Sequence, residues 1–342
     1  NSLDDEGSED SIPKPKKLSA WERLVLERTP LTGEERGEGA VDVAWFDRTW
    51  KQLGEKRWMQ LASAAKFAAN SAQAKKAQFL ADVLAGKTQL QELVDGIEKR
   101  KLKDYVRLVG LLPLATGTKR EKDIQARYET LQSYKKYARG LSGLTKPAAM
   151  RAVDIGFENL ARLAGFPDPL RLEWAMEAAS IRDLAKGAVS VTKEGVTASL
   201  SLDEHAKPQL TVSKNGKPIK AIPAPLKKKH AELAELGERA AELRKKASRI
   251  KQSLEAAMCR GDAFTAAEVQ QLFEQALLAP YISRLILVGE GIVGYPDHGG
   301  KTLRNHAGKQ EPIKKHEVLR LAHPVDLLAH GDWDKWQREC FA

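Results

Sequence analysis

Apolar residues recur at helical spacing through the first half of the chain, from Val41 to about Lys186. Two sets each share one helical face: Trp58, Leu61, Ala62, Ala65 and Ala69, and then Phe79, Leu80, Val83 and Leu84. Segments that contain glycine or proline interrupt the pattern at 86, 110–113, 140–147 and 165–169. We therefore predict about five to seven helices, which together form a helical domain over residues 41–187.

The first 40 residues are patterned differently. Residues 1–17 show no apolar period, and an acidic start is followed by proline and lysine, so we expect a loosely held tail. Residues 19–29 begin with a serine cap and carry an apolar stripe, which predicts a short helix. Residues 30–40 are rich in glycine and glutamate and predict a loop.

Apolar positions alternate between residues 188 and 223, at a period typical of strands. Turn residues interrupt the alternation at Glu194-Gly195, near Glu204 and at Asn215-Gly216. Asn-Gly between alternating segments is a strong hairpin signal. We predict about three or four antiparallel strands here, at the start of an α+β domain over residues 188–342.

The clearest helix is predicted over residues 226–259. Its apolar positions are spaced alternately by three and four residues, at Leu233, Leu236, Ala240, Leu243, Ala247, Ile250, Leu254 and Ala257. Such a seam forms a coiled coil between two chains, or it packs against other helices of the same chain. The alanines favour close packing within one chain. At the end of the seam, Cys259 is expected to be a small buried residue.

Residues 264–342 have a mixed pattern. A capping box of Thr265 and Glu268 begins a predicted helix that runs to Leu278. Strands are predicted at 283–288 and 318–321 around a glycine-rich stretch, and a helix from Pro324 to about Arg338. The expected fold class is α+β and predominantly helical: a helical region, a small antiparallel sheet, a long heptad-patterned helix and a mixed C-terminal segment.

The excess of basic residues indicates a candidate binding surface. The chain has 56 Lys and Arg against 46 Asp and Glu, a net charge of +10. The first ten residues hold five carboxylates and no Lys or Arg, so the remaining 332 carry +15. Candidate residues for binding nucleic acid or a partner are Lys217, Lys220, Lys227, Lys228, Lys229, Arg244, Lys245 and Arg249. The alternative is that these residues are the solvated faces of ordinary helices.

Two glycine motifs resemble phosphate-binding loops and fail on inspection. Gly289–Gly294 matches G-x-G-x-x-G, but Tyr295-Pro296-Asp297 and further glycines follow it, so no helix is expected after it. Gly300-Lys301-Thr302 resembles the end of a P-loop, but Tyr295 occupies the position of the first glycine. We predict no cofactor.

The histidines form no metal-binding motif, since none of the seven makes an H-x-x-x-H or H-E-x-x-H pair. Asp297, His298, His306 and His323 are a candidate functional polar cluster, within an enzyme or metal site over residues 289–330. The alternative is exposed loop histidines, with His323 bracing the turn before Pro324. Two cysteines exclude a disulfide framework and a four-cysteine zinc site. No catalytic residue is assigned, and the chain is expected not to be an enzyme.

No apolar run reaches the roughly 18 residues of a membrane span, and no signal peptide is seen. We expect a cytoplasmic protein that does not contact membranes.

Several blocks together resemble one bacterial family. They are Ile97–Arg100, Val109–Leu114, Asn159–Arg162, Gly165–Leu170, Leu172–Glu177, Pro223–Lys228, Leu254–Met258, Arg260–Thr265 and Arg320–Leu327. In this order they resemble the MolR-like proteins, named after the molybdate metabolism regulator, which carry a domain of unknown function and in some members a WGR domain. The resemblance covers about residues 41–341.

That resemblance implies an internal piece of a long bacterial cytoplasmic protein. It also implies protein partners, namely the rest of the parent chain and a MoxR-type ATPase system, and it supplies no catalytic residues. The leading hypothesis is a non-catalytic interaction, scaffold or regulatory module of a larger protein. The alternatives are a nucleic-acid-binding module that uses the basic residues, and an unrecognised enzyme or metal site in residues 289–330.

Overall fold

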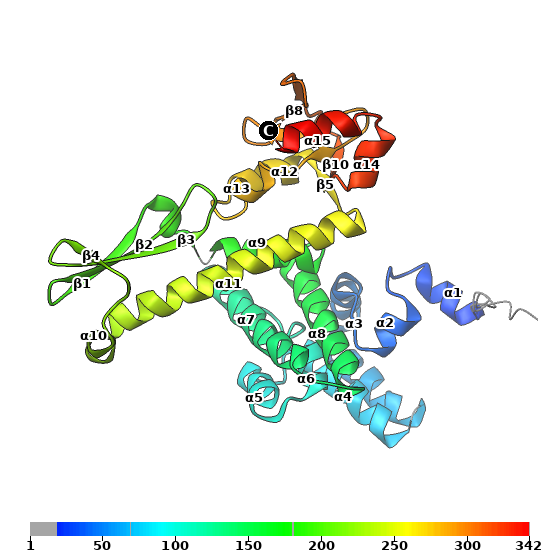
Figure 1. Ribbon diagram of the computed structural model, residues 1–342. Coiled ribbons are helices and arrows are strands. Elements are labelled where there is room, and N and C mark those ends of the chain that lie inside the picture. Colours follow the sequence, from blue (N-terminus) through cyan, green and yellow to red (C-terminus); the bar gives the residue numbers. More distant parts are fainter. Residues whose placement is uncertain (1–18, 69, 180, 342) are drawn as a thin grey trace, which may run out of the picture. The chain divides into compact units, whose positions relative to one another are not determined.

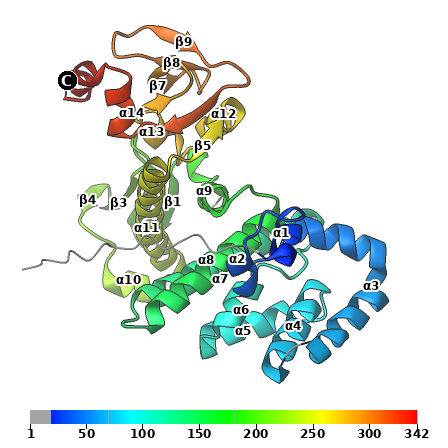
Figure 2. The same ribbon diagram turned by 90° about the vertical axis from the view of Figure 1, so that its right-hand side faces the viewer.

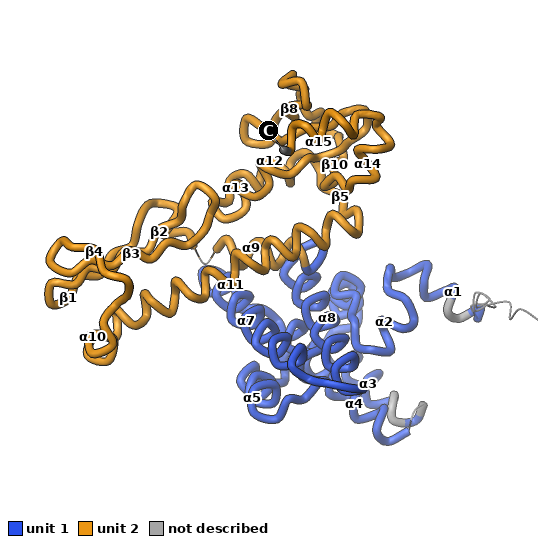
Figure 3. The backbone as a smooth tube through the Cα atoms, viewed as in Figure 1, with its two compact units in different colours: residues 1–169 blue, residues 170–342 orange. Residues whose placement is uncertain are grey.

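The computed structural model describes residues 19–68, 70–179 and 181–341. The chain divides into two compact units, residues 1–169 and residues 170–342, coloured separately in Figure 3. The predicted tail over residues 1–17 lies outside the described residues. The predicted domains 41–187 and 188–342 stay a prediction.

The described part of the first unit contains helices and no strands. They are α1 (Ala20–Leu26), α2 (Gly33–Gly37), α3 (Val43–Ala68), α4 (Ser71–Leu84), α5 (Leu90–Arg100), α6 (Lys103–Leu108), the 3-10 turn η1 (Gly117–Lys119), α7 (Arg120–Arg139) and α8 (Thr145–Ala164). The loop expected over residues 30–40 is wrong at α2. A capping box of Thr32 and Glu35 begins this short helix and satisfies its first amides.

α8 lies at the centre of the first unit and packs against α6 and α7. Figure 2 shows α7 and α8 side by side. Two glycines allow α6 and its C-terminal turn to approach α8: a Cβ on Gly156 would lie 2.5 Å from the Val106 carbonyl oxygen, and one on Gly110 would lie 2.6 Å from the Leu160 nitrogen. This contact therefore requires glycine at both positions.

α3 is bent at Gly54, where φ is 70° and ψ is 166°, outside the helical region. In a straight helix, residues 46 and 58 would be about 18 Å apart along the axis. The rings of Phe46 and Trp58 are instead 5.0 Å apart between centroids. The bend thus folds the second half of α3 back toward its first half.

The second unit begins with α9 (Pro169–Ala179) and the 3-10 turn η2 (Leu184–Lys186). An antiparallel meander follows, in the order β1 (Val189–Lys193), β2 (Val196–Leu202), β3 (Pro208–Lys214) and β4 (Lys217–Ile219). These strands confirm the predicted hairpins. At the last turn Asn215 and Gly216 both have positive φ, 48° and 80°, as an Asn-Gly hairpin turn requires.

After the short α10 (Ala224–Lys229), the long helix α11 (Ala231–Arg260) confirms the heptad prediction. Its seam residues are buried in a core shared with the strands of the same unit. α11 packs against β1, β2, β3 and β10 (Figure 1), so the seam serves packing within the chain, chiefly on strands rather than on helices. Cys259 is exposed, which corrects the expectation that it is buried.

The remaining elements form a second, six-stranded antiparallel sheet in the order β5-β10-β6-β7-β8-β9, with helices around it. They are β5 (Ala263–Thr265), α12 (Ala266–Phe273), α13 (Ala279–Ile282), β6 (Leu287–Val288), β7 (Val293–Asp297), β8 (Thr302–Arg304), β9 (Gln310–Pro312), β10 (Val318–Leu321), α14 (Pro324–Ala329) and α15 (Trp333–Phe341). The fold is α+β and predominantly helical, as predicted.

Three boundaries in this segment differ from the prediction. The glycine-rich stretch, for which no strand is predicted, contains β7 and β8, which pair with each other. The capping box of Thr265 and Glu268 is present, but α12 ends at Phe273 instead of continuing to Leu278. The last helix is two helices, since Gly331 at φ 75° ends the turn after α14.

Candidate functional site

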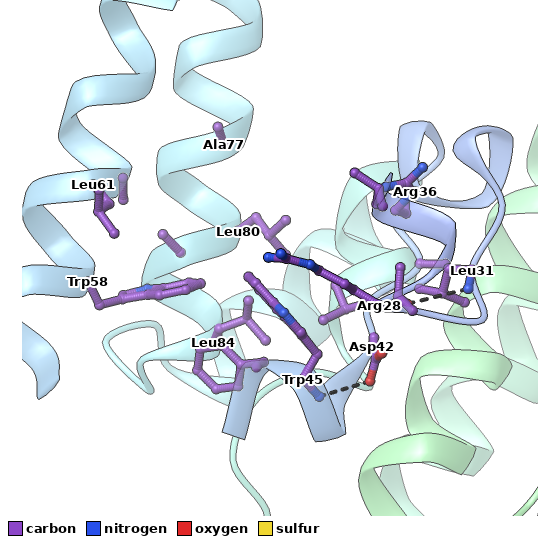
Figure 4. Close-up of a pocket in the computed structure, with 17 residues that line it drawn as sticks. Arg28, Leu31, Arg36, Asp42, Trp45, Trp58, Leu61, Ala77, Leu80 and Leu84 are labelled. Carbon is purple, nitrogen blue, oxygen red and sulfur yellow. Dashed lines mark hydrogen bonds between the residues drawn. The ribbon is translucent and has the colours of Figure 1, made fainter. Parts of the chain in front are cut away.

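An apolar pocket of about 620 Å³ lies in the first unit, between the α1–α2 segment, α3 and α4. Its lining includes Leu31, Trp45, Phe46, Trp58, Leu61, Leu80 and Leu84. Figure 4 shows Trp58 and Leu61 on one side of the space and Leu80 and Leu84 on another. A concave, mostly apolar site with few polar groups is typical of a binding pocket.

Aromatic rings form one wall of this pocket. Phe46 lies edge-on to Trp58, and both rings contact Trp50, which does not itself line the pocket and lies 5.7 Å from Phe46 and 6.2 Å from Trp58 between centroids. The indole Nε1 of Trp58 is buried and has no hydrogen-bond partner. The bend at Gly54 brings these three rings together, so the wall depends on the shape of α3.

Two cations line the pocket, Arg28 and Arg36, and neither has a carboxylate partner among the described residues. Figure 4 shows the Arg28 side chain reaching over the pocket. No described residue forms an ion pair with Arg28. Arg36 is held by a hydrogen bond that it donates to the Thr32 carbonyl at 3.2 Å, and Asp42 accepts one from the Trp45 amide at 2.9 Å. A bound group with a negative charge would therefore find its counterion at Arg28.

Part of the lining is exposed to solvent. The side chain of Leu61 is 58% exposed and that of Trp45 is 42% exposed, although both are large and apolar. Trp58, Leu61 and Ala62 share the helical face that the pattern predicts; on it Leu61 is exposed, whereas Trp58 and Ala62 are half-buried. A contiguous open apolar surface marks an interaction site. The sequence offers one signal for it: Gly54 interrupts a helical stretch rich in tryptophan.

The predicted basic residues lie at two places on the second unit. Lys217, Lys220, Lys227, Lys228 and Lys229 lie on β4, α10 and the turn that joins them, whereas Arg244, Lys245 and Arg249 lie along α11. Arg244 is about 20 Å along the helix axis from Ala231.

Several of these cations already have carboxylate partners. Lys229 pairs with Glu194 at 2.5 Å, and Lys245 pairs with Glu242 at 3.1 Å. Arg249 donates two hydrogen bonds, of 2.7 and 2.9 Å, to Glu177, whose side chain is fully buried. These pairings hold the structure together and reduce the charge that is free for a ligand.

The structure brings Asp297 and His298 of the candidate polar cluster together, since the His298 amide donates to the Asp297 carboxylate at 2.7 Å, whereas His306 and His323 contact other neighbours. His298 lies 3.2 Å from the Thr302 hydroxyl in the β7–β8 turn, and the adjacent Asp297 accepts a hydrogen bond from Gln310. His306 lies edge-on to Trp336, with its Nε2 3.6 Å from Asp332.

His323 caps α14, accepting a weak hydrogen bond from the Val325 amide at 3.4 Å, with Pro324 in the first turn. Within the described ranges, no group of three or more His, Cys, Asp or Glu side chains is arranged to hold a metal ion. Among the helices described here, none combines the length and apolar character needed to cross a bilayer.

Comparison with known proteins finds two family models. Residues 21–176 match a family of unknown function (DUF5724), and residues 216–342 match a domain of unknown function (DUF4132). No curated protein and no solved structure matches the chain. These matches correct the resemblance to MolR-like proteins, because neither model indicates that family or an association with a WGR domain. Over these two segments the chain is similar to two families whose function is unknown.

Proposed function

We propose that this chain is a non-catalytic interaction module whose first unit docks an amphipathic helix of a partner protein. The observation that carries the proposal is the apolar pocket with its exposed Leu61 and Trp45 side chains. Leaving such side chains in water costs free energy, which a covering apolar surface recovers at about 25 cal/mol per Å².

The pocket also indicates the kind of partner. A cavity of about 620 Å³ lined by leucine and aromatic side chains suits two or three large apolar side chains. A helix supplies such anchors at positions i, i+3, i+4 and i+7. Because Arg28 has no carboxylate partner among the described residues, we expect an Asp or Glu beside the apolar anchors.

The experiment is selection of a helical peptide library displayed on phage against the whole chain. We expect enriched peptides with Leu, Ile or Phe at helical spacing and an acidic residue next to them. A Leu61→Glu variant should weaken their binding by about tenfold or more, equivalent to about 1.4 kcal/mol. Arg28→Glu should weaken it by a smaller factor, and most for peptides that carry the acidic residue.

Leu144→Glu is the matched control. Leu144 is also in the first unit and is 95% exposed, but it does not line the pocket. Its replacement should leave peptide affinity unchanged. The proposal fails when no helical consensus emerges, or when Leu144→Glu and Leu61→Glu weaken binding equally.

A second candidate function is polyanion binding at the corner formed by β4 and α10. Lys217, Lys220, Lys227 and Lys228 are exposed there, and none of them forms an ion pair with a described residue. Binding to labelled duplex DNA, measured between about 50 and 200 mM salt, should show a steep salt dependence. Lys227→Glu with Lys228→Glu should abolish this binding, whereas Lys119→Glu with Lys146→Glu in the first unit should reduce it only slightly.

A further inference from the structure

A second cavity, of about 400 Å³, lies on the second unit. It is lined by Lys207, Pro208, Gln209, Arg244, Ala247, Ser248, Lys251 and Tyr281. We call it the β3–α11 cleft, because β3 begins at Pro208 and α11 supplies half of the lining. It shares no residue with the apolar pocket of the first unit or with the lysines at the β4–α10 corner.

One face of α11 builds the cleft. Arg244, Ala247, Ser248 and Lys251 are spaced by three, one and three residues, so their side chains share a helical face. The two small side chains lie between the two long cations. A hollow with a positive charge at each end results, and Lys207 adds a third cation from the segment that leads into β3.

The three cations differ from the others on this helix. No described carboxylate forms an ion pair with Lys207, Arg244 or Lys251. Arg239, Lys245, Lys246 and Arg249 on α11 all have carboxylate partners, which are Asp183, Glu242 and Glu177. One carboxylate lies beside the cleft: Asp203 accepts hydrogen bonds from the Lys207 amide at 2.8 Å and from the Gln209 side chain at 3.1 Å, but it forms no ion pair with the three cations. Three cations against one carboxylate leave the cleft with an excess of positive charge.

Tyr281, in α13, completes the lining. Its hydroxyl oxygen is buried and has no hydrogen-bond partner, which is costly for a polar group. The Lys251 ammonium lies over its ring, 5.5 Å from the centroid. Burial raises the pKa of the Tyr281 hydroxyl, and the negative charge of Asp203 raises it further, so the group stays a protonated donor at neutral pH.

From these contacts we propose that the β3–α11 cleft binds a phosphate monoester group. Such a group carries up to two negative charges and three terminal oxygens, which match three cations and one hydroxyl donor. A carboxylate has one charge and two oxygens and would leave donors unused. A nucleic-acid strand needs cations in a row along successive phosphates, whereas these surround one hollow.

Access to the tyrosine hydroxyl requires one movement. This oxygen is closed off from solvent, so a phosphate reaches it only if side chains of the lining move; we infer that the exposed Lys251 side chain, which lies over the ring, swings to the incoming phosphate. The ammonium then exchanges a contact with the ring for a charged hydrogen bond. The hydroxyl gains the acceptor that it lacks.

The test is titration of the whole chain with inorganic phosphate at pH 7.5, followed by calorimetry and by the ³¹P line width. We expect saturable binding at one site. Arg244→Gln and Lys251→Gln should each weaken it by about tenfold, and Tyr281→Phe by about threefold. The matched control is Lys245→Gln on the same helix, whose ammonium pairs with Glu242 and should not affect phosphate binding.

Two further probes distinguish the source of the phosphate. Tighter binding of adenosine monophosphate than of inorganic phosphate would indicate a small phosphorylated molecule that fills the cleft. Equal affinity would indicate recognition of the phosphate group alone, as on a modified side chain. Absence of saturable phosphate binding, or binding that Arg244→Gln leaves unchanged, overturns the proposal. An oligonucleotide that binds more tightly through the same residues, with a steep salt dependence, overturns it in favour of a nucleic-acid surface.

Discussion

Asn159 shows how one polar side chain organises the first unit. It is fully buried, and its amide satisfies three backbone groups from two separate segments. Its Oδ1 accepts from the Val41 amide at 3.0 Å, and its Nδ2 donates to the carbonyls of Gly39 and Arg107, both at 2.9 Å. The connection before α3 and the end of α6 are thereby joined to α8, next to the pocket-forming elements.

Replacing Asn159 by leucine keeps the volume and removes all three hydrogen bonds. Three backbone groups of half-buried residues lose their partners, so we expect the free energy of unfolding to fall by about 3 kcal/mol. Urea unfolding followed by circular dichroism measures this loss. Asn70→Ala is the control, since Asn70 is an exposed N-cap of α4 and its loss should cost about 1 kcal/mol. Equal losses in the two variants would contradict the structural role of Asn159.

The stabilisation that the Asp326 side chain gives to the native state depends on pH. Its carboxylate accepts hydrogen bonds from Arg320 at 2.5 Å and from the His323 amide at 2.9 Å. The Arg320 hydrogen bond is the main reason that the pKa of Asp326 lies below its usual value of 3.8. The native state therefore binds this proton more weakly than the unfolded state, so the stabilisation is present above about pH 4 and is lost as the pH falls through the native pKa.

We expect Asp326→Asn to lower the stability of α14 by about 1 kcal/mol at pH 7 and by less at a pH below the usual carboxyl pKa, because the native carboxylate becomes protonated as the pH falls. Hydrogen exchange of the α14 amides at the two pH values measures the difference. An Asp326→Asn effect that is the same at both values would show that the Arg320 pair does not stabilise the helix.

Among the elements, α3 has the shape on which the pocket depends. Gly54 lies at φ 70° and ψ 166°, a backbone region that is open essentially to glycine alone. A Cβ there would meet no atom within 4 Å, so a substitution would act through backbone strain and not through a clash. The need for glycine at the bend therefore comes from the backbone conformation and not from contact with neighbouring side chains.

Gly54→Ala should destabilise the bend by about 1–3 kcal/mol and favour a straighter α3. The rings of Phe46 and Trp58 would then separate, and tryptophan fluorescence should shift to longer wavelength together with weaker peptide binding. Gly37→Ala is the control, because that glycine has a negative φ and an open Cβ position. An unchanged fluorescence spectrum in Gly54→Ala would show that the bend does not need glycine.

Over the whole molecule, each compact unit has its own buried core. The core of the second unit joins the seam of α11 to both sheets, with Leu243 almost fully buried at its centre. α8 provides the centre of the first unit through buried Val153, Ile155 and Leu160. Two cores in one chain predict two units of local stability.

Leu243→Ala should remove about 3 kcal/mol from the second unit through lost burial and a cavity. Hydrogen exchange with mass spectrometry should then show weaker protection across residues 170–342 and unchanged protection in residues 19–68 and 70–169. Ala241→Gly, at an exposed position of the same helix, is the control for a change in helix propensity alone, about 1 kcal/mol. Equal loss of protection in both units would show that they unfold together.

The sequence by itself determined the local elements of this protein. The heptad spacing from Leu233 to Ala257 predicts α11, Asn215-Gly216 predicts the hairpin of β3 and β4, and Thr265 with Glu268 predicts the start of α12. These signals are readable because helix period, turn conformation and capping each depend on residues a few positions apart.

Only the tertiary structure decided which faces are closed and which charges are neutralised. Arg249, one of the candidate basic residues, pairs with Glu177, which is 72 positions away in the sequence. Arg244, another of them, has no carboxylate partner among the described residues. Leu61 shares a helical face with Trp58 and yet stays exposed, because Gly54 turns that half of α3. Burial and ion pairing depend on residues far apart in the chain, and a periodic pattern carries no record of which distant segment covers it.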